Sequence, residues 1–189
     1  MNIIFLDIDG VLNNSSTYDI FNSSCDPVCF YHFMNAFHEI NNQLKSLKIV
    51  ISSTWRGMKF SDFELVIKET RSEKLKELFP YLHSDWRTNH FSEISTTPRE
   101  KYCRGYEIQD WLSRHPEIEN YLIIDDDSDF IENQHYLQTN YDLGFGLFEN
   151  EILKIYFLNT SKKYAYCFGR NRTKITTKNI KNFCLKNWI

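Results

Sequence analysis

The sequence predicts an α/β fold with a mostly parallel central sheet flanked by helices. Two short apolar runs, Ile3–Leu6 and Tyr121–Ile124, each end in carboxylates, which is typical of buried parallel strands. A third apolar run, Ile49–Ile51, ends in hydroxyl residues. Segments with helical spacing lie between these runs, and strands that alternate with helices form a parallel sheet with right-handed crossovers.

The individual elements follow from the spacing of apolar residues. We expect four strands, at residues 2–7, 48–52, 121–125 and 136–139. We expect three helices, at residues 28–46, 61–79 and 104–114. The first of these helices has apolar residues on one face, which would pack on the sheet. The second is expected to break near Arg71 and to end before Pro80, and the stretch 81–100 has loop composition with no clear period.

Length and composition favour one globular domain. The chain has 189 residues, of which 42% are hydrophobic and 16% are aromatic. No apolar run approaches the length of about 18 residues that a membrane span requires. The N-terminus lacks the charged region and cleavage site of a signal peptide, so we expect a cytoplasmic protein with no membrane partner. Five scattered cysteines without a Cys-x-x-Cys pair indicate reduced thiols.

Acidic residues at two strand ends are the most informative feature of the chain. Asp7 and Asp9 follow the first strand and would point the same way, and Gly10 allows a sharp turn after them. Asp125 and Asp126 follow a later strand. Ligand sites in open α/β sheets lie outside the carboxyl ends of strands, and clustered carboxylates need a compensating charge. The pattern predicts Mg²⁺-dependent phosphate chemistry, and the alternative is an ordinary Asp-rich turn.

Hydroxyl and guanidinium groups supply candidate phosphate ligands. Ser52 and Ser53 follow the apolar run 49–51 and precede Arg56, and hydroxyl, backbone N–H and guanidinium groups can all hold phosphoryl oxygens. The alternative is a serine-rich turn in which a hydroxyl caps a helix. Arg104 lies at the start of a predicted helix, where it would balance the carboxylates; the alternative is a solvated side chain or a partner for Glu107.

These motifs resemble those of the haloacid dehalogenase (HAD) superfamily of phosphohydrolases. The resemblance rests on four motifs in the right order: Asp7-Ile8-Asp9-Gly10-Val11, Ser52, Arg104 and Asp125-Asp126. More narrowly, the chain resembles HAD domains attached to RNA-repair enzymes and the phosphatase half of polynucleotide kinase-phosphatases. The segments that carry this narrower resemblance are 10–13, 53–56, 104–108 and 111–112. The chain departs from the family in having Arg rather than the commoner Lys in the third motif, and in its doubled serines, which leave either Ser52 or Ser53 as the phosphate ligand.

The resemblance implies a Rossmann-like HAD core that is capless or minimally capped, because no insert is long enough for a separate lid. It implies that Asp7 is the nucleophile, which forms an aspartyl-phosphate, and that Asp9 is the general acid and base. Mg²⁺ would be held by Asp7, Asp125 and the backbone carbonyl of Asp9, with Asp126 orienting this shell or sharing the metal through water. Asn13 and Arg56 are further candidate substrate contacts.

Three functions remain open on this basis. The first is a phosphomonoesterase for a nucleotide or polynucleotide phosphate end. The second is a protein phosphatase, for instance on phosphotyrosine, and the third is a non-catalytic HAD-fold binding module. The expected partner is therefore a phosphorylated substrate, either a nucleic acid end or a phosphoprotein, and no obligate protein partner is evident.

Charge divides the chain into an acidic body and a basic end. Residues 151–189 contain nine Lys or Arg and one Glu, a net charge of +8, whereas the whole chain carries −3 and residues 1–150 therefore carry −11. We expect a phosphatase core at 1–157 and a basic C-terminal extension, 158–189, packed on it. Aromatic residues between the basic ones suit contact with a polynucleotide, but they would equally fill a core beneath solvated lysines.

Overall fold

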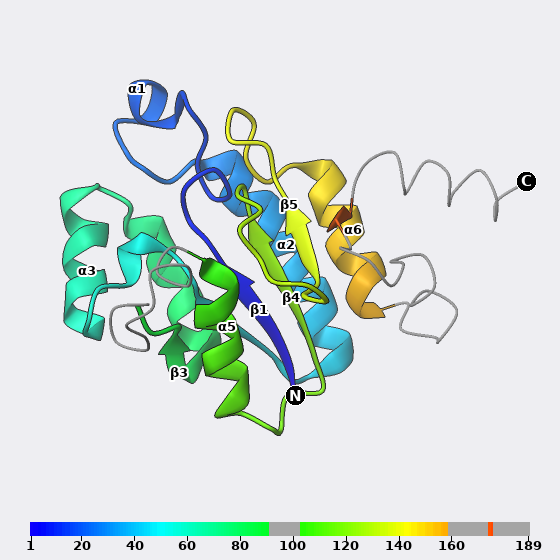
Figure 1. Cartoon of the computed structure of the whole chain (residues 1–189). Helices are drawn as coiled ribbons and strands as arrows, with labels where there is room; N and C mark the ends of the chain where they lie inside the picture. The colour runs from blue at the N-terminus through cyan, green and yellow to red at the C-terminus, as the bar shows by residue number, and fades with distance from the viewer. Residues whose placement is uncertain (91–102, 159–173, 176–189) are drawn as a thin grey trace, which may run out of the picture.

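Six parallel strands form one sheet at the centre of the molecule (Figure 1). The computed structural model describes residues 1–90, 103–158 and 174–175. The strands follow the order β3-β2-β1-β4-β5-β6 across the sheet. Their bounds are β1 Asn2–Leu6, β2 Leu47–Ile51, β3 Leu82–Arg87, β4 Asn120–Asp125, β5 Tyr136–Gln138 and β6 Lys174–Ile175. The predicted α/β fold with a parallel central sheet is therefore confirmed.

The middle of the sheet is apolar on both of its faces. β1 lies between β2 and β4 and pairs in parallel with each. Ile4 and Leu6 pack into a large core on one face, whereas Ile3 and Phe5 pack into a smaller core on the other. This packing explains the continuous apolar run in the sequence, because a strand that is covered on both faces has no polar side.

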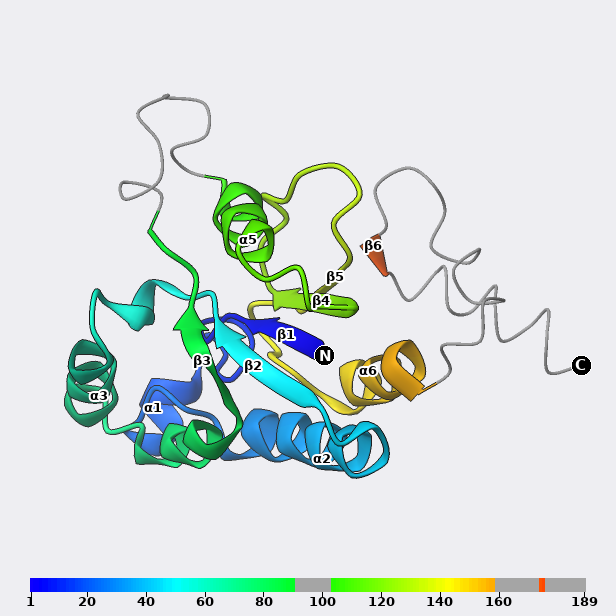
Figure 2. The ribbon, with the colours of Figure 1, turned by 90° about the horizontal axis from the view of Figure 1, so that it is seen from below.

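Helices cover both faces of the sheet, with α2 and α6 on one face and α5 on the other (Figure 2). Their bounds are α2 Pro27–Leu44, α5 Arg104–Ser113 and α6 Leu147–Leu158. The carboxylate of Asp26 accepts hydrogen bonds from the backbone N–H groups of Val28 and Cys29 at 2.7 and 3.1 Å. This cap satisfies donors that have no partner within the first turn, which explains why α2 begins where it does.

Further helices lie in the connections between the strands. They are α1 Thr17–Phe21, α3 Phe60–Glu69, and the 3₁₀ helices η1 Thr54–Arg56 and η2 Glu73–Tyr81. The expected break near Arg71 is confirmed, because this residue has φ 55° between α3 and η2. The expected end before Pro80 is wrong, because η2 continues through it. Pro80 is the penultimate residue of this nine-residue 3₁₀ helix, so the N–H that proline lacks removes one hydrogen bond of the last turn only.

β3 and α6 are the longest of the elements that the sequence did not predict. β3 lies within the stretch for which we predicted no regular structure, and that prediction is wrong for residues 82–87, while residues 91–100 lie outside the described residues. β3 pairs with β2 at the edge of the sheet, with a register shift, and its mixed polar composition shows no apolar run. The second element is α6, whose buried residues Asn150, Leu153 and Phe157 do have helical spacing.

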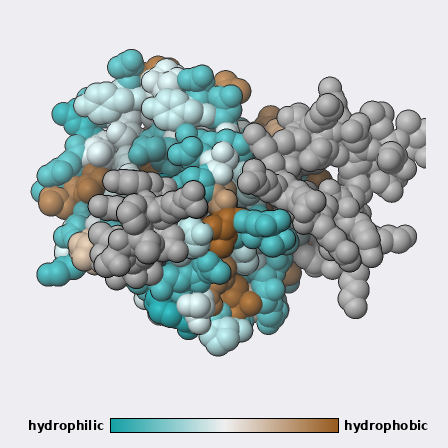
Figure 3. All heavy atoms as spheres, in the orientation of Figure 1, coloured by the Kyte–Doolittle hydropathy of each residue, from teal (hydrophilic) through white to brown (hydrophobic). Residues whose placement is uncertain are grey.

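Among the described residues, the connections after β1 and β2 hold α2, α3 and η2, whose buried apolar side chains belong to the same core as the sheet, which agrees with a capless or minimally capped arrangement. On the side seen in Figure 3, hydrophilic residues predominate over the described part, and hydrophobic ones gather only in small patches. None of the helices we describe combines the length and apolar character needed to cross a bilayer.

The predicted basic extension, 158–189, lies almost wholly outside the described residues. Its one described part beyond α6 is β6, which pairs in parallel with β5. The proposed boundary at residue 157 therefore stays a prediction.

Candidate active site

The carboxyl ends of the three central strands bring the first, second and fourth motifs together. Leu6 pairs with Ile51 on one side and with Ile124 on the other. The residues that follow are Asp7, Ser52 and Asp125, so the same register places them side by side. Backbone hydrogen bonds continue to this point, from Ser52 N to Leu6 O at 2.8 Å and from Asp7 N to Ile124 O at 3.0 Å. Residues up to 118 positions apart in the sequence therefore share one edge of the sheet.

Three carboxylates form a cluster at this edge. Asp7, Asp125 and Asp126 each offer an oxygen within 4.8 Å of the others. Burial raises the pKa of Asp7 to about 6, against the opposing charge of Arg104. Burial and the charge of Asp7 raise the pKa of Asp125 to about 8, and burial also raises the pKa of Asp126. The cluster thus carries more negative charge than its surroundings balance, which is the environment that a bound cation relieves.

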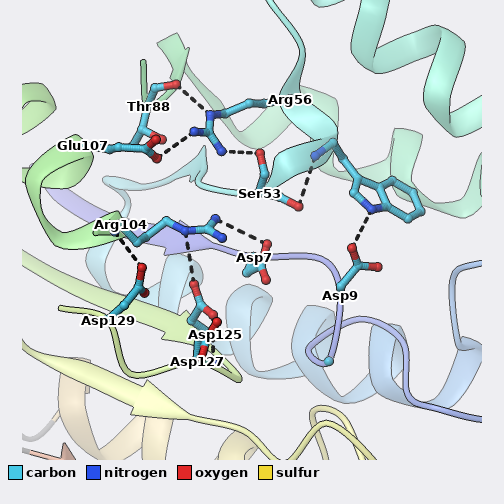
Figure 4. A network of polar contacts seen from close by, with 12 residues as sticks. Asp7, Asp9, Ser53, Arg56, Thr88, Arg104, Glu107, Asp125, Asp127 and Asp129 are labelled. Atoms are coloured by element: carbon cyan, nitrogen blue, oxygen red, sulfur yellow. Dashed lines mark hydrogen bonds and ion pairs between the residues drawn. The ribbon is translucent and has the colours of Figure 1, made fainter. Parts of the chain in front are cut away.

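Arg104 provides positive charge at the cluster from the first turn of α5 (Figure 4). Its Nη1 lies 3.6 Å from Oδ1 of Asp7, and its Nε lies 3.8 Å from Oδ2 of Asp125. These distances are those of ion pairs and are too long for good hydrogen bonds. Nη1 of Arg104 and Oδ2 of Asp125 are buried and have no hydrogen-bond partner among the described residues. The guanidinium therefore keeps donor capacity that a ligand oxygen can use.

A further acid holds the start of α5 in place. Oδ2 of Asp129 accepts a hydrogen bond from the backbone N–H of Arg104 at 2.9 Å. Gly105 is the next residue, and a Cβ there would lie 2.5 Å from the backbone nitrogen of Ile131. The helix can therefore approach the loop after β4 closely enough for Arg104 to reach the carboxylates.

The two adjacent serines have different partners. The Ser53 hydroxyl accepts a hydrogen bond from the backbone N–H of Trp55 at 3.4 Å, and its interaction with Asp7 lowers the pKa of that carboxyl. The Ser52 hydroxyl is buried and has no hydrogen-bond partner among the described residues. Because buried polar atoms are rarely left unpaired, an unpartnered hydroxyl beside Asp7 indicates a place for a ligand.

Asp9 lies on the loop that follows β1 and is held by two side chains. Its Oδ1 accepts a hydrogen bond from Nδ2 of Asn13 at 2.9 Å, and its Oδ2 accepts one from the indole N–H of Trp55 at 2.9 Å. Oδ1 of Asn13 in turn accepts from the backbone N–H of Gly10 at 2.7 Å. Asn13 is thus engaged within the protein, and the contact with substrate that the sequence led us to expect would require this arrangement to open.

Arg56 is deeply buried, with 2% of its side chain exposed. Its Nη2 donates to Oε2 of Glu107 at 2.6 Å, its Nε donates to the backbone carbonyl of Thr88 at 2.9 Å, and its Nη1 donates to that of Ser53. Burial lowers the pKa of Arg56 to about 10, which leaves it cationic at neutral pH. In this structure Arg56 links the loop after β2 to α5, and a contact with substrate would break that link.

The loop after β4 and the end of β5 are both held against the loop after β1. The hydroxyl of Thr139 donates to the backbone carbonyl of Gly10 at 2.7 Å, and a Cβ at Gly10 would lie 2.5 Å from Cγ of Asp126. The side chain of Gln138 donates to the backbone carbonyl of Asp126 at 2.7 Å. Asp127 is exposed, in keeping with a solvated turn. Sequence reasoning had no signal for Thr139 or Gln138, because neither belongs to a motif.

Comparison with known proteins places these motifs in one family. The family described as "HAD domain in Swiss Army Knife RNA repair proteins" matches residues 3–147, which is more than half of the chain. The match covers all four motifs, from Asp7 to Asp126. Comparisons with curated proteins and with solved structures gave no match.

Proposed function

The chain belongs to the family of HAD domains found in Swiss Army Knife RNA repair proteins, and we propose that it is a Mg²⁺-dependent phosphomonoesterase for a nucleotide or polynucleotide phosphate end. The family membership supports a HAD-type hydrolase or phosphatase. The metal, the covalent intermediate and the substrate are our proposal. The main observation in support of this proposal is that the side chains of Asp7, Asp125 and Arg104 lie together in a buried site, beside the unpartnered hydroxyl of Ser52.

The acidic cluster fits Mg²⁺, which prefers oxygen ligands and keeps several waters. Asp7, Asp125 and the backbone carbonyl of Asp9 would hold the ion, with Asp126 as a ligand through water or as an orienting group. The raised pKa values of Asp7 and Asp125 fit this role, because both carboxylates lack sufficient compensating charge. When bound, Mg²⁺ would neutralise charge on the phosphate and on the cluster.

The reaction would proceed in two halves on the side chains of the first motif. In the first half, a carboxylate oxygen of Asp7 attacks phosphorus, the bond to the leaving oxygen breaks, and Asp9 gives a proton to that oxygen. In the second half, Asp9 takes a proton from water, the water oxygen attacks phosphorus, and the bond to Asp7 breaks. Asp7 is thereby regenerated and inorganic phosphate is released.

Ser52 and Arg104 would hold the phosphoryl oxygens during both halves. We assign the phosphate contact to Ser52 rather than Ser53, because the Ser53 hydroxyl already accepts a hydrogen bond from the backbone N–H of Trp55, whereas the Ser52 hydroxyl has no partner among the described residues. Arg104 would stabilise the charge that spreads over the phosphoryl oxygens in the transition state.

The RNA-repair setting named for the family favours a polynucleotide end as the substrate. The lack of a separate folded lid among the described residues supports the same choice, since an open site admits the end of a long chain. A substrate panel tests the proposal: a 3′-phosphorylated oligonucleotide, a mononucleotide and a phosphotyrosine peptide, each with Mg²⁺ and again with EDTA. We expect phosphate release from the oligonucleotide with Mg²⁺ and none with EDTA. Preference for the peptide would overturn the substrate assignment, and no release from any of the three would overturn the proposed function.

A further inference from the structure

The carboxylate of Asp9 is held by hydrogen bonds from the loop after β1 and from the segment after β2. One oxygen accepts from the amide of Asn13 and the other from the indole of Trp55, both at 2.9 Å. In Figure 4, the carboxylate of Asp9 faces the indole of Trp55, on the segment that follows Ser53. The two donors come from different loops, four and 46 positions away in the sequence.

The orientation of the Asn13 amide is determined by its other partners. Its oxygen accepts from the backbone N–H of Gly10 at 2.7 Å, and its nitrogen also donates to the backbone carbonyl of Ser24 at 3.1 Å. A flipped amide would place its oxygen against that carbonyl and against the Asp9 carboxylate. Asn13 can therefore only donate to Asp9 in this arrangement.

Trp55 is also held independently of Asp9. It lies in η1, directly after Ser53 and Thr54, and its partly buried ring packs against the large core. An indole N–H is a donor and has no acceptor capacity. Both partners of Asp9 thus complement a carboxylate oxygen, the form that accepts a proton from water.

We propose that Trp55 and Asn13 are positioning residues that aim the Asp9 carboxylate at the attacking water in the second half of the reaction. This inference rests on the proposed function. In that half one water proton moves to Asp9, the water oxygen bonds to phosphorus, and the electron pair of the breaking P–O bond returns to Asp7. The indole also ties this carboxylate to the loop that carries the Ser52 hydroxyl, so the acid–base group and the phosphate-holding loop keep a constant separation.

The test is Trp55→Phe, which keeps an aromatic ring and removes the N–H. With an aryl phosphate, whose good leaving group needs little protonation, the first half should continue while the second half slows. We expect kcat to fall by about 10- to 100-fold, as for other small misplacements of catalytic groups, and KM to fall with it, because kcat/KM reports the first half, which is unchanged. The phosphorylated enzyme should accumulate and be seen in acid-quenched samples as the mass gain of one phosphoryl group.

The matched control is Trp111→Phe. It removes an indole N–H that donates to the backbone carbonyl of Asp85 at 3.0 Å, on the part of α5 beyond Arg104. We expect it to lower stability without accumulation of phosphoenzyme. A double-mutant cycle adds a second readout: Trp55→Phe should have almost no further effect on kcat in an Asp9→Asn background, because Trp55 acts through Asp9.

The outcomes separate the two proposals. No phosphatase activity in the wild-type protein would overturn the proposed function. An active wild type with Asp9→Asn impaired, but with Trp55→Phe behaving like Trp111→Phe, would overturn the positioning role alone. If Trp55→Phe does not fold, Asn13→Ser removes the other hydrogen bond and should give the same accumulation of phosphoenzyme, and its absence would likewise overturn the role.

Discussion

Replacing Glu107 by alanine should destabilise the protein by about 3 kcal/mol. Glu107 pairs with Arg56 at 2.6 Å, and the exposed fractions of the two side chains are 11% and 2%. Removing one partner of a buried ion pair typically costs about 3–5 kcal/mol, because the other charge is left buried without compensation. We expect the lower end of that range, since Arg56 keeps its hydrogen bonds to the backbone carbonyls of Thr88 and Ser53.

Thermal or urea unfolding of Glu107→Ala and the wild type measures this loss. For a chain of this size, about 3 kcal/mol corresponds to a fall in Tm of about 6–12 °C. Glu73→Ala is the matched control, because Glu73 pairs with Lys76 on the surface, where the two side chains are 57% and 47% exposed. Such surface pairs contribute about 0–1 kcal/mol. A loss in Glu107→Ala no larger than that in Glu73→Ala would refute the reasoning.

The remaining predictions concern the reaction and the metal. Asp7→Asn should abolish turnover of any phosphate ester with little change in Tm, because the amide keeps the size of the carboxylate but cannot act as the nucleophile; near wild-type turnover would argue against this assignment. Asp9→Asn should lower turnover by about 10²–10⁴-fold, most for poor leaving groups, while calorimetric Mg²⁺ binding persists through the backbone carbonyl; equal small effects on good and poor leaving groups would contradict it. The pKa of Asp125 is raised from 3.8 to about 8, so the metal-free folded protein holds a proton that the unfolded chain releases. This contribution to stability is complete below about pH 4 and is lost as the pH rises through about 8. The gain in Tm that Mg²⁺ produces should therefore grow with pH in the wild type, and much less in Asp125→Asn. A gain in Tm that does not vary with pH would count against the site. The next change neutralises four basic residues of the C-terminal extension, Lys162, Lys163, Arg170 and Arg172. It should raise KM for an oligonucleotide and flatten the salt dependence of KM, while hydrolysis of an aryl phosphate stays unchanged. Equal losses for both substrates would indicate that these residues have a structural role.

The sequence predicted the central strands correctly because each is marked by a few consecutive apolar residues. The runs before Asp7 and Asp125 are apolar because both faces of β1 and β4 are covered, and a strand of this kind is recognisable from its own few residues. The carboxylates follow directly, so their place at the sheet edge required only the assumption that the two strands are neighbours. The edge strand β3 was missed because its polar residues carry no such run.

The sequence did not predict which side chains would pair with one another. The sequence suggested Arg56 as a phosphate ligand because it follows two serines, yet in the fold Arg56 is buried against Glu107, 51 positions away. Trp55 lies in one of the segments that carry the family resemblance, and the sequence suggested no role for it, yet its indole N–H donates to Asp9, 46 positions away. Each residue type is compatible with several partners, and only the packing of distant segments decides which donors are already used.

By itself, then, the sequence determined the class of fold, the strands at its centre and the carboxylates at their ends, because each depends on a short pattern of burial and charge. The tertiary structure decided which polar groups at that edge are committed and which are not. Ser52 and Ser53 are adjacent and chemically alike, but the Ser53 hydroxyl interacts with Asp7 and accepts from the backbone N–H of Trp55, whereas the Ser52 hydroxyl has no partner among the described residues. That difference arises from contacts between β1, β2 and the loops beyond them, and no pattern along one segment contains it.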